Sequence, residues 1–241
     1  MQTARRIWVP PSTRSGAKFR GLFDVRCLAP FADREQVLWA LRKEGLPDPL
    51  KELPTVAAML EVKQERVPVS WVKKCLRLDR FDPAKFEVLQ SLISEKWRAV
   101  AENLVVNVGL QHILDAVFSG ATQVDPWYVM LASASPSPAA ADTMASHAGW
   151  TEFTDYDEAT RQIWVEVRSG QSMDNSASKA AFTISQDSSS IGGAALTSDN
   201  TKTGTSGTLM CCAAFTGGNK AADDDDTLEV QYAFSAADDG A

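Results

Sequence analysis

The chain has 241 residues, with 24 Lys and Arg against 31 Asp and Glu and a formal net charge of −7. That length gives room for one large domain or two modest ones, each able to bury a core. No stretch approaches the roughly 20 apolar residues of a membrane span, and the start lacks the apolar run of a signal peptide. We therefore expect a soluble protein that is made in a cytoplasm.

The charge is unevenly divided along the chain. The first 100 residues hold 19 Lys and Arg against 12 Asp and Glu, which leaves 5 against 19 for the remainder. Such asymmetry indicates either a surface that docks on an acidic partner or helices that carry their usual basic side chains on a solvent face. The sequence leaves both interpretations open.

The first 30 residues divide into two parts. Residues 1–17 are polar, basic and proline-bearing, and we interpret them as an extended arm. Residues 18–30 alternate apolar and polar positions as a strand does. Arg and aromatic side chains anchor interfaces well, so the start of the chain is the predicted docking segment. The candidate partner-binding residues are Arg5, Arg6, Trp8, Arg14, Lys18 and Arg20.

Residues 31–96 have a helical period and predict three short helices. Asp33 is placed to cap the first, which should stop at Gly45, and Thr55 is placed to cap the second. The pair Asp82 and Pro83 is a strong start signal for the third. The buried stripe expected on this third helix is Phe86, Leu89, Ile93 and Trp97.

The stretch TVAAMLEVKQERVPVSWVKK, residues 55–74, has the outline of a DNA-binding helix-turn-helix. It departs from that pattern because Glu61 stands where the turn usually has glycine, and Pro68 falls inside the would-be recognition helix. An ordinary helical hairpin with a basic face is the favoured interpretation. The run that follows Pro68 is either extended or a separate helix from Ser70.

Residues 97–241 read mainly as short strands. A strand over 103–106 precedes a helix over 109–118, in which Leu110, Ile113, Leu114 and Val117 are expected to pack inward. WYVMLA, residues 127–132, is apolar on both parities and predicts a strand covered on both faces. Further strands are expected near 151–154, 162–168, 181–185, 191–196, 209–215 and 228–234.

Loops rich in Gly, Ser, Asn and Asp separate these strands. Short strands separated by such loops are typical of an antiparallel sandwich or jelly roll. We therefore expect an α+β protein with a β-sandwich over residues 97–241, joined by the strand of residues 18–30, and a short-helix insertion over 31–96.

No pattern in the chain predicts a reaction centre, a metal site or a cofactor site. His112 and His147 lack metal-ligand spacing from another His or Cys, and structural roles are favoured for both. Cys27, Cys75 and the adjacent pair at 211–212 form no CxxC motif, so we expect free core thiols in a reducing compartment.

The acidic run Asp223–Asp226 leaves two interpretations open. Its carboxylates are hard oxygen ligands of the kind that calcium takes. Adjacent Asp side chains on a turn diverge, however, and the run lacks the alternating DxDxDG spacing. A solvated hairpin that leads into the strand DTLEVQYAF is therefore favoured over a calcium site.

Several phrases resemble a family of tailed-bacteriophage virion proteins. They are KFRGLFDVRCL near the start, ENLVVNVGLQHILDAVFSGATQVDPWYVMLA, DTMASHAGWTEFTDYDEATRQIW, ASKAAFTISQDSSSIGGAALTSDNTKTGTSGTL and DTLEVQYAFSAADDG. The resemblance covers residues 18–28 and 97–241, so the helical segment looks like an insertion relative to the family. Membership implies a structural part of the particle, assembled in the host cytoplasm: a head decoration or cement protein, a head fibre, or a tail component.

The leading hypothesis is a non-enzymatic decoration protein. It would bind the major capsid protein through the arm, the first strand and the basic helical part, and would project the acidic sandwich outward. From how such proteins behave, the resemblance also suggests self-association, for example as a trimer. The alternatives are a tail or head-fibre component that contacts the host surface, and a helix-turn-helix-like protein that binds nucleic acid.

Overall fold

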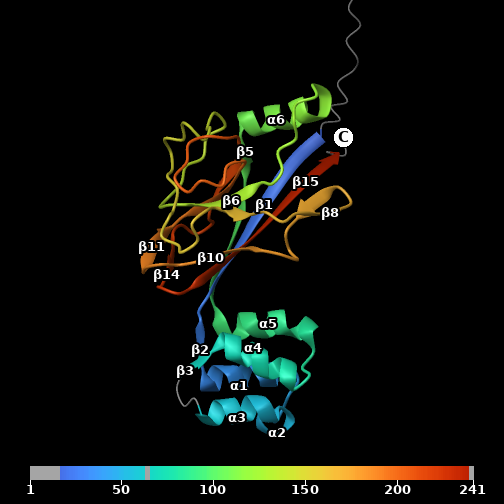
Figure 1. Cartoon of the computed structure of the whole chain (residues 1–241), viewed down its shortest axis with the longest axis vertical. Helices are drawn as coiled ribbons and strands as arrows, with labels where there is room; N and C mark the ends of the chain where they lie inside the picture. The colour runs from blue at the N-terminus through green and yellow to red at the C-terminus, as the bar shows by residue number, and fades with distance from the viewer. Residues whose placement is uncertain (1–16, 63–65, 239–241) are drawn as a thin grey trace, which may run out of the picture.

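The computed structural model describes residues 17–62 and 66–238, and it is of mixed α and β type with antiparallel sheets (Figure 1). Two larger sheets form one part, which we call the β body. Five helices form a separate lobe beyond one end of it, which we call the helical lobe. Each part has a hydrophobic cluster of its own.

The first large sheet has the strand order β4-β1-β15-β9-β8, and β10 also pairs with β15. Its centre is the antiparallel pair β1 and β15, which runs unbroken from Ala17 opposite Asp238 to Leu28 opposite Thr227. The bounds are β1 Ala17–Leu28, β4 Glu95–Glu102, β8 Val167–Ser169, β9 Ser172–Asp174, β10 Ala180–Thr183 and β15 Thr227–Asp238.

The second large sheet has the order β5-β13-β12-β6-β7. Its strands are β5 Leu104–Val105, β6 Tyr128–Ala132, β7 Gln162–Ile163, β12 Gly193–Thr197 and β13 Leu209–Ala214. One main cluster takes side chains from both sheets, for example Phe23 and Tyr232 from the first and Leu131 and Leu196 from the second. A core shared in this way holds the two sheets together.

The prediction that residues 127–132 form a strand covered on both faces is confirmed. Strand β6 is buried on both faces, because Val129 and Leu131 lie in the main cluster and Met130 lies in a smaller one with Trp150. The vicinal cysteines also point to opposite faces, with Cys211 in the main cluster and Cys212 in the smaller one. Alternation along a strand produces both results.

Two other strand predictions were wrong in detail. The single strand expected over 162–168 is divided, because β7 pairs in the second sheet and β8 pairs in the first. The segment 151–154 forms one isolated bridge, from Glu152 to Ala132, and no strand. A small pair, β11 Ser188–Ile191 with β14 Lys220–Ala222, completes the strands of the β body.

The helical lobe interrupts the connection between β1 and β4. These strands pair directly, with Leu28 opposite Glu95, so the lobe hangs from what would otherwise be a hairpin turn. Its helices are α1 Arg34–Lys43, α2 Pro49–Glu52, α3 Pro54–Val62, α4 Val69–Leu78 and α5 Pro83–Ser94, and its short strands are β2 Phe31–Asp33 and β3 Arg66–Pro68.

The helix caps of the lobe differ from the prediction in two of three cases. Asp82 caps α5 as expected, since its side chain accepts a hydrogen bond from the amide of Ala84 at 2.9 Å. Asp33 precedes α1 but makes no such bond. The start of α3 is capped by Asp79, whose two carboxylate oxygens accept the amides of Thr55 and Val56 at 3.0 Å. Thr55 therefore lies inside α3 and does not cap it.

The stripe predicted for α5 is also partly wrong. Leu89 and Ile93 are buried and Phe86 is half-buried against the lobe cluster. Trp97, however, belongs to β4, because the helix ends at Ser94 and the strand begins at once. Its ring packs against the main cluster of the β body.

Helix α6, Asn107–Phe118, lies at the end of the β body opposite the helical lobe (Figure 1). Gly109 allows close approach to β13, because a Cβ at this position would lie 2.4 Å from the carbonyl oxygen of Met210. Only the first half of the expected inward stripe packs, since Leu110 and Ile113 are half-buried. Leu114 and Val117 are 55% and 66% exposed, which contradicts the prediction.

Candidate functional site

Most of the predicted docking residues lie outside the described part of the chain. Arg5, Arg6, Trp8 and Arg14 precede residue 17, and the side chain of Lys18 is not described. Arg20 is exposed on β1, where it pairs with Ser235. The structure therefore locates the point from which the arm leaves the β body, and one of its cations.

That point is at the α6 end of the molecule (Figure 1). β1 then runs for 12 residues toward the helical lobe, a length of about 36 Å at roughly 3.3 Å per residue. The arm and the helical lobe are thus attached at opposite ends of one strand.

The charge distribution separates these two regions as well. Residues 1–20 contain five Lys and Arg and no Asp or Glu, whereas residues 31–96 contain 12 Lys and Arg against 11 Asp and Glu. The positive surplus of the first 100 residues therefore comes mainly from the arm and its root. The helical lobe is close to neutral overall, which removes one reason to treat it as a docking surface for an acidic partner.

The second half of α6 has an exposed apolar face. Leu114, Val117 and Phe118 share this face at helical spacing and are 55%, 66% and 80% exposed. The exposed carboxylate of Asp115 lies within the same turn. The helical period predicted that Leu114 and Val117 pack inward, because periodicity identifies an apolar face but does not show what lies beneath it.

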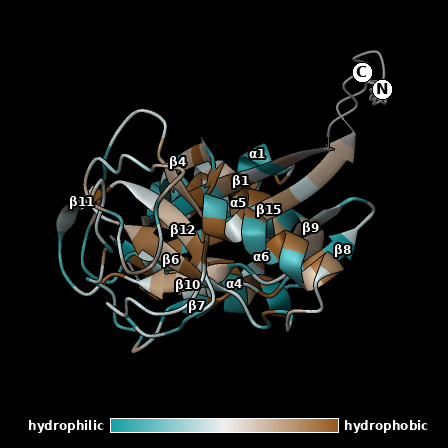
Figure 2. Cartoon of the chain, turned by 90° about the horizontal axis from the view of Figure 1, so that it is seen from above, coloured by the Kyte–Doolittle hydropathy of each residue, from teal (hydrophilic) through white to brown (hydrophobic). Residues whose placement is uncertain are grey.

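Apolar groups continue from this face to the start of β1. Ile113 of α6 and Met173 of β9 line a pocket of about 140 Å³ with Phe234 of β15. The ring of Phe234 stacks on that of Phe19, with ring centroids 5.8 Å apart. In the view from above, β8 and β9 lie toward the same side of the molecule as α6 (Figure 2). An apolar path therefore connects α6 with the root of the arm.

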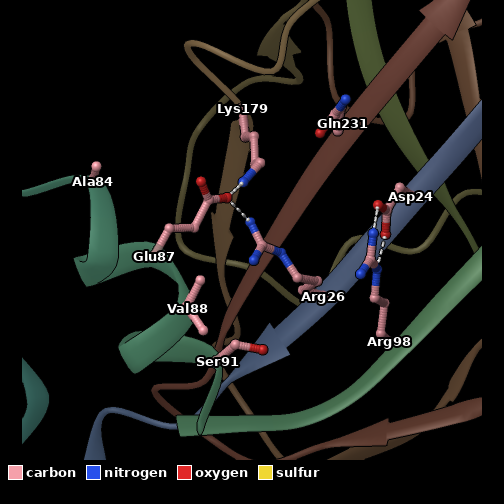
Figure 3. A pocket seen from close by; sticks show the side chains of 9 residues that line it. All are labelled: Asp24, Arg26, Ala84, Glu87, Val88, Ser91, Arg98, Lys179 and Gln231. Carbon is pink, nitrogen blue, oxygen red and sulfur yellow. Dashed lines mark hydrogen bonds and ion pairs between the residues drawn. The ribbon is translucent and has the colours of Figure 1, made fainter. Parts of the chain in front are cut away.

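A second pocket, of about 320 Å³, lies between the helical lobe and the β body (Figure 3). Glu87 of α5 reaches across it to Arg26 of β1 at 2.8 Å and to Lys179, beside β10, at 2.6 Å. Arg26 also contacts Glu229 at 3.2 Å. Burial raises the pKa of Glu229, and the nearby Arg26 opposes that shift. The charges in this pocket are paired across it, so we interpret them as a clamp between the two parts.

The acidic run is organised around a lysine. The side chain of Asp226 is 2% exposed, and its Oδ2 accepts hydrogen bonds from Lys96 Nζ at 2.6 Å and from the amide of Asp223 at 2.8 Å. Lys96 also contacts Asp223 at 2.6 Å. Burial lowers the pKa of Lys96, but these hydrogen bonds outweigh burial and raise it. The expected solvated hairpin is therefore correct for the exposed Asp223, Asp224 and Asp225 but wrong for Asp226, which is buried beside the ammonium group of Lys96.

A buried ion pair joins two loops of the β body. Arg161 and Glu152 have side chains that are 1% and 8% exposed, and they form two hydrogen bonds of 2.9 and 2.8 Å. Arg161 also donates to the carbonyl oxygens of Asp199 and Gly204 at 2.9 Å. Glu152 accepts the amide of Thr203 at 2.8 Å. The pair has a full set of partners and a structural role.

Both histidines make aromatic contacts in the fold. His112 packs edge-on against Trp127, with ring centroids 5.5 Å apart. His147 stacks on Trp150 at 4.1 Å, and its Nδ1 lies 2.9 Å from the carbonyl oxygen of the same residue. These contacts agree with the structural roles expected for them.

The four cysteines are free thiols. Cys27, Cys211 and Cys212 are buried, and burial raises the pKa of all three, to about 11 for Cys211. Cys75 is half-buried, and its pKa is raised as well, again chiefly by burial. A thiol with a raised pKa is a poor nucleophile near neutral pH.

The structure bears on the helix-turn-helix interpretation in two ways, through the position of Pro68 and through the length of the connection between α3 and α4. Pro68 precedes α4 and does not interrupt it, so the objection based on this proline was wrong. Six residues separate Val62 from Val69, however, and they include β3, whereas the turn of this motif has about three or four. α4 exposes Lys73, Lys74 and Arg77, but its connection to α3 is not that of the motif.

Within residues 17–62 and 66–238, no group of His, Cys, Asp or Glu is arranged to hold a metal ion. No helix in the same ranges is long and apolar enough to cross a bilayer. Comparisons with protein-family models, with curated proteins and with solved structures found no match to this chain.

Proposed function

We propose that this chain is a non-enzymatic structural protein of a tailed-bacteriophage particle, most simply a decoration or cement protein on the head. It docks on the major capsid protein with the α6 end of a jelly-roll-like β-sandwich, chiefly through the basic arm. The observation that carries this proposal is the concentration of five Lys and Arg, with no acidic residue, in the 20 residues that lead into that end. The resemblance to phage virion proteins supplies the class of partner.

The positions of the arm and the helical lobe at opposite ends of β1 indicate how the chain would be oriented on the particle. Since the arm and the helical lobe are attached at opposite ends of β1, a chain docked by its arm projects the lobe away from the capsid (Figure 1). The lobe is near neutral in charge, and the acidic β body lies between. The arrangement thus differs from the initial hypothesis, in which the helical part shared the docking surface.

Binding to empty capsids of the phage that carries the gene tests the proposal. We expect the double change Arg5→Ala with Arg6→Ala to weaken binding about tenfold or more, because Arg side chains at interfaces commonly carry more than 1 kcal/mol each. Raising the salt concentration should also weaken capsid binding by the unmodified chain.

The matched control removes two exposed cations from the helical lobe, Arg42→Ala with Lys51→Ala. This control lowers the net charge of the chain by the same amount as the arm variant. A difference in capsid binding between the two variants therefore reflects where the cations lie and not the total charge. Equal loss in both variants would contradict docking by the arm. Imaging that located the protein on the tail would replace the head assignment with the tail or fibre alternative.

A further inference from the structure

We propose that the exposed apolar face of α6 is the seat of the arm, and that it binds the stretch Ile7, Trp8 and Val9 of the same chain. This inference rests on the proposed function for its purpose, since a seated arm would present its remaining cations in a fixed place to the partner. Its test uses the free protein, so it can fail or hold separately from capsid binding.

The exposed apolar face of α6 is expected to be covered by another segment or molecule. Leu114, Val117 and Phe118 are three large apolar side chains in adjacent turns, each more than half exposed. Single exposed apolar residues are common on soluble proteins, but a contiguous row marks a surface that is covered by something. The half-buried Ile113 extends the row toward the pocket beneath α6.

The arm is within reach of this face. Ala17, where β1 begins, lies nine positions after Trp8, and an extended chain over that interval spans about 30 Å. The path between them is apolar, since Phe19 stacks on Phe234, and Phe234 lines one pocket with Met173 and Ile113. A segment that follows this path arrives at α6.

The sequence of the arm fits the face in both polarity and charge. Ile7, Trp8 and Val9 are the longest apolar run in residues 1–16, and Arg5 and Arg6 come directly before it. On the α6 side, Asp115 is exposed at the edge of the apolar row, and the helix ends at Phe118. The C-terminal end of a helix carries partial negative charge, so it favours the same cations.

Tethering strengthens such a contact. A segment joined to its seat by a short linker meets it at an effective concentration in the millimolar range, so a modest contact suffices to keep it bound. The second half of α6 is exposed where the first half is half-buried, and a bound arm would cover it. In this arrangement the arm completes the apolar environment of the helix.

Disulfide trapping in the full-length chain tests the seat. Pro10→Cys is combined with Ser119→Cys; both positions adjoin the proposed contact, Ser119 is exposed, and Trp8 and Phe118 stay in place. Mild oxidation should give a cross-linked monomer, seen on a non-reducing gel and by mass spectrometry. The control pairs Pro10→Cys with Leu78→Cys, since Leu78 is 64% exposed in the helical lobe at the other end.

We expect the α6 pair to cross-link at least tenfold faster than the control. We also expect Trp8→Ala to speed hydrogen exchange in residues 114–118 severalfold, whereas Trp39→Ala, an exposed tryptophan of the lobe, should leave it unchanged. Equal cross-linking in both pairs, or a product that is a dimer, would overturn the proposal; the dimer would place the arm on a neighbouring copy. Cross-linking without capsid binding would leave the seat intact and refute the proposed function.

Discussion

The strongest test of the fold is the removal of Glu152 from its buried pair with Arg161. Glu152→Ala leaves a guanidinium that is 1% exposed without its carboxylate, and it frees the amide of Thr203 as well. Breaking a buried pair on one side costs about 3 to 5 kcal/mol, because the remaining charge stays desolvated. We therefore expect urea unfolding to show a loss of this size in the free energy of unfolding of the β body.

Two comparison variants make that result interpretable. Lys51→Ala breaks a surface pair between side chains that are 85% and 48% exposed, Lys51 and Asp48, and should leave the free energy of unfolding nearly unchanged because water screens the pair. The double change Glu152→Leu with Arg161→Met removes both charges and should restore much of the loss. A loss below about 1 kcal/mol in Glu152→Ala would refute the reasoning, and so would a double variant less stable than the single one.

Three further results are expected. Replacing residues 31–93 with an Asn-Gly turn should leave a folded β body by circular dichroism, since β1 and β4 pair directly; a molten product would show that the helical lobe is required. Calcium or a chelator should leave the melting temperature unchanged, whereas Lys96→Met should lower it by several degrees, because the carboxylate of Asp226 would then lack its cation. A thiol reagent at pH 8 should modify at most Cys75 in the native chain and all four cysteines after denaturation, and rapid reaction of a second thiol would contradict the burial found.

Local signals in the sequence predicted local structure well. Asp82 and Pro83 set the start of α5, because a capping side chain and a fixed φ act within one turn. The alternating strand near the start of the chain became β1 for a similar reason, since side-chain alternation and burial coincide there. In both places the determining residues are neighbours in the sequence.

Features that depend on distant residues were not predictable from the pattern. The cap of α3 comes from Asp79, more than 20 residues away, and Lys96 meets Asp226 across 130 residues. The exposure of Val117 depends on where the supporting sheet ends, and Trp97 left the expected helix because β4 begins at Glu95. The candidate docking region was found from composition alone, but the face on α6 needed the fold.

The clamp of Glu87 with Arg26 and Lys179 bears on how firmly the helical lobe is held to the β body. The helical lobe is joined to the β body by two crossings of the backbone, near residues 29 and 94, and by Glu87, which contacts Arg26 and Lys179. Glu87 is 66% exposed, so water and salt weaken these ion pairs. The lobe is consequently held in one orientation mainly by its short connections. A lobe that needs little from the β body can be gained or lost without disturbing the arm, the α6 face or the paired strands between them.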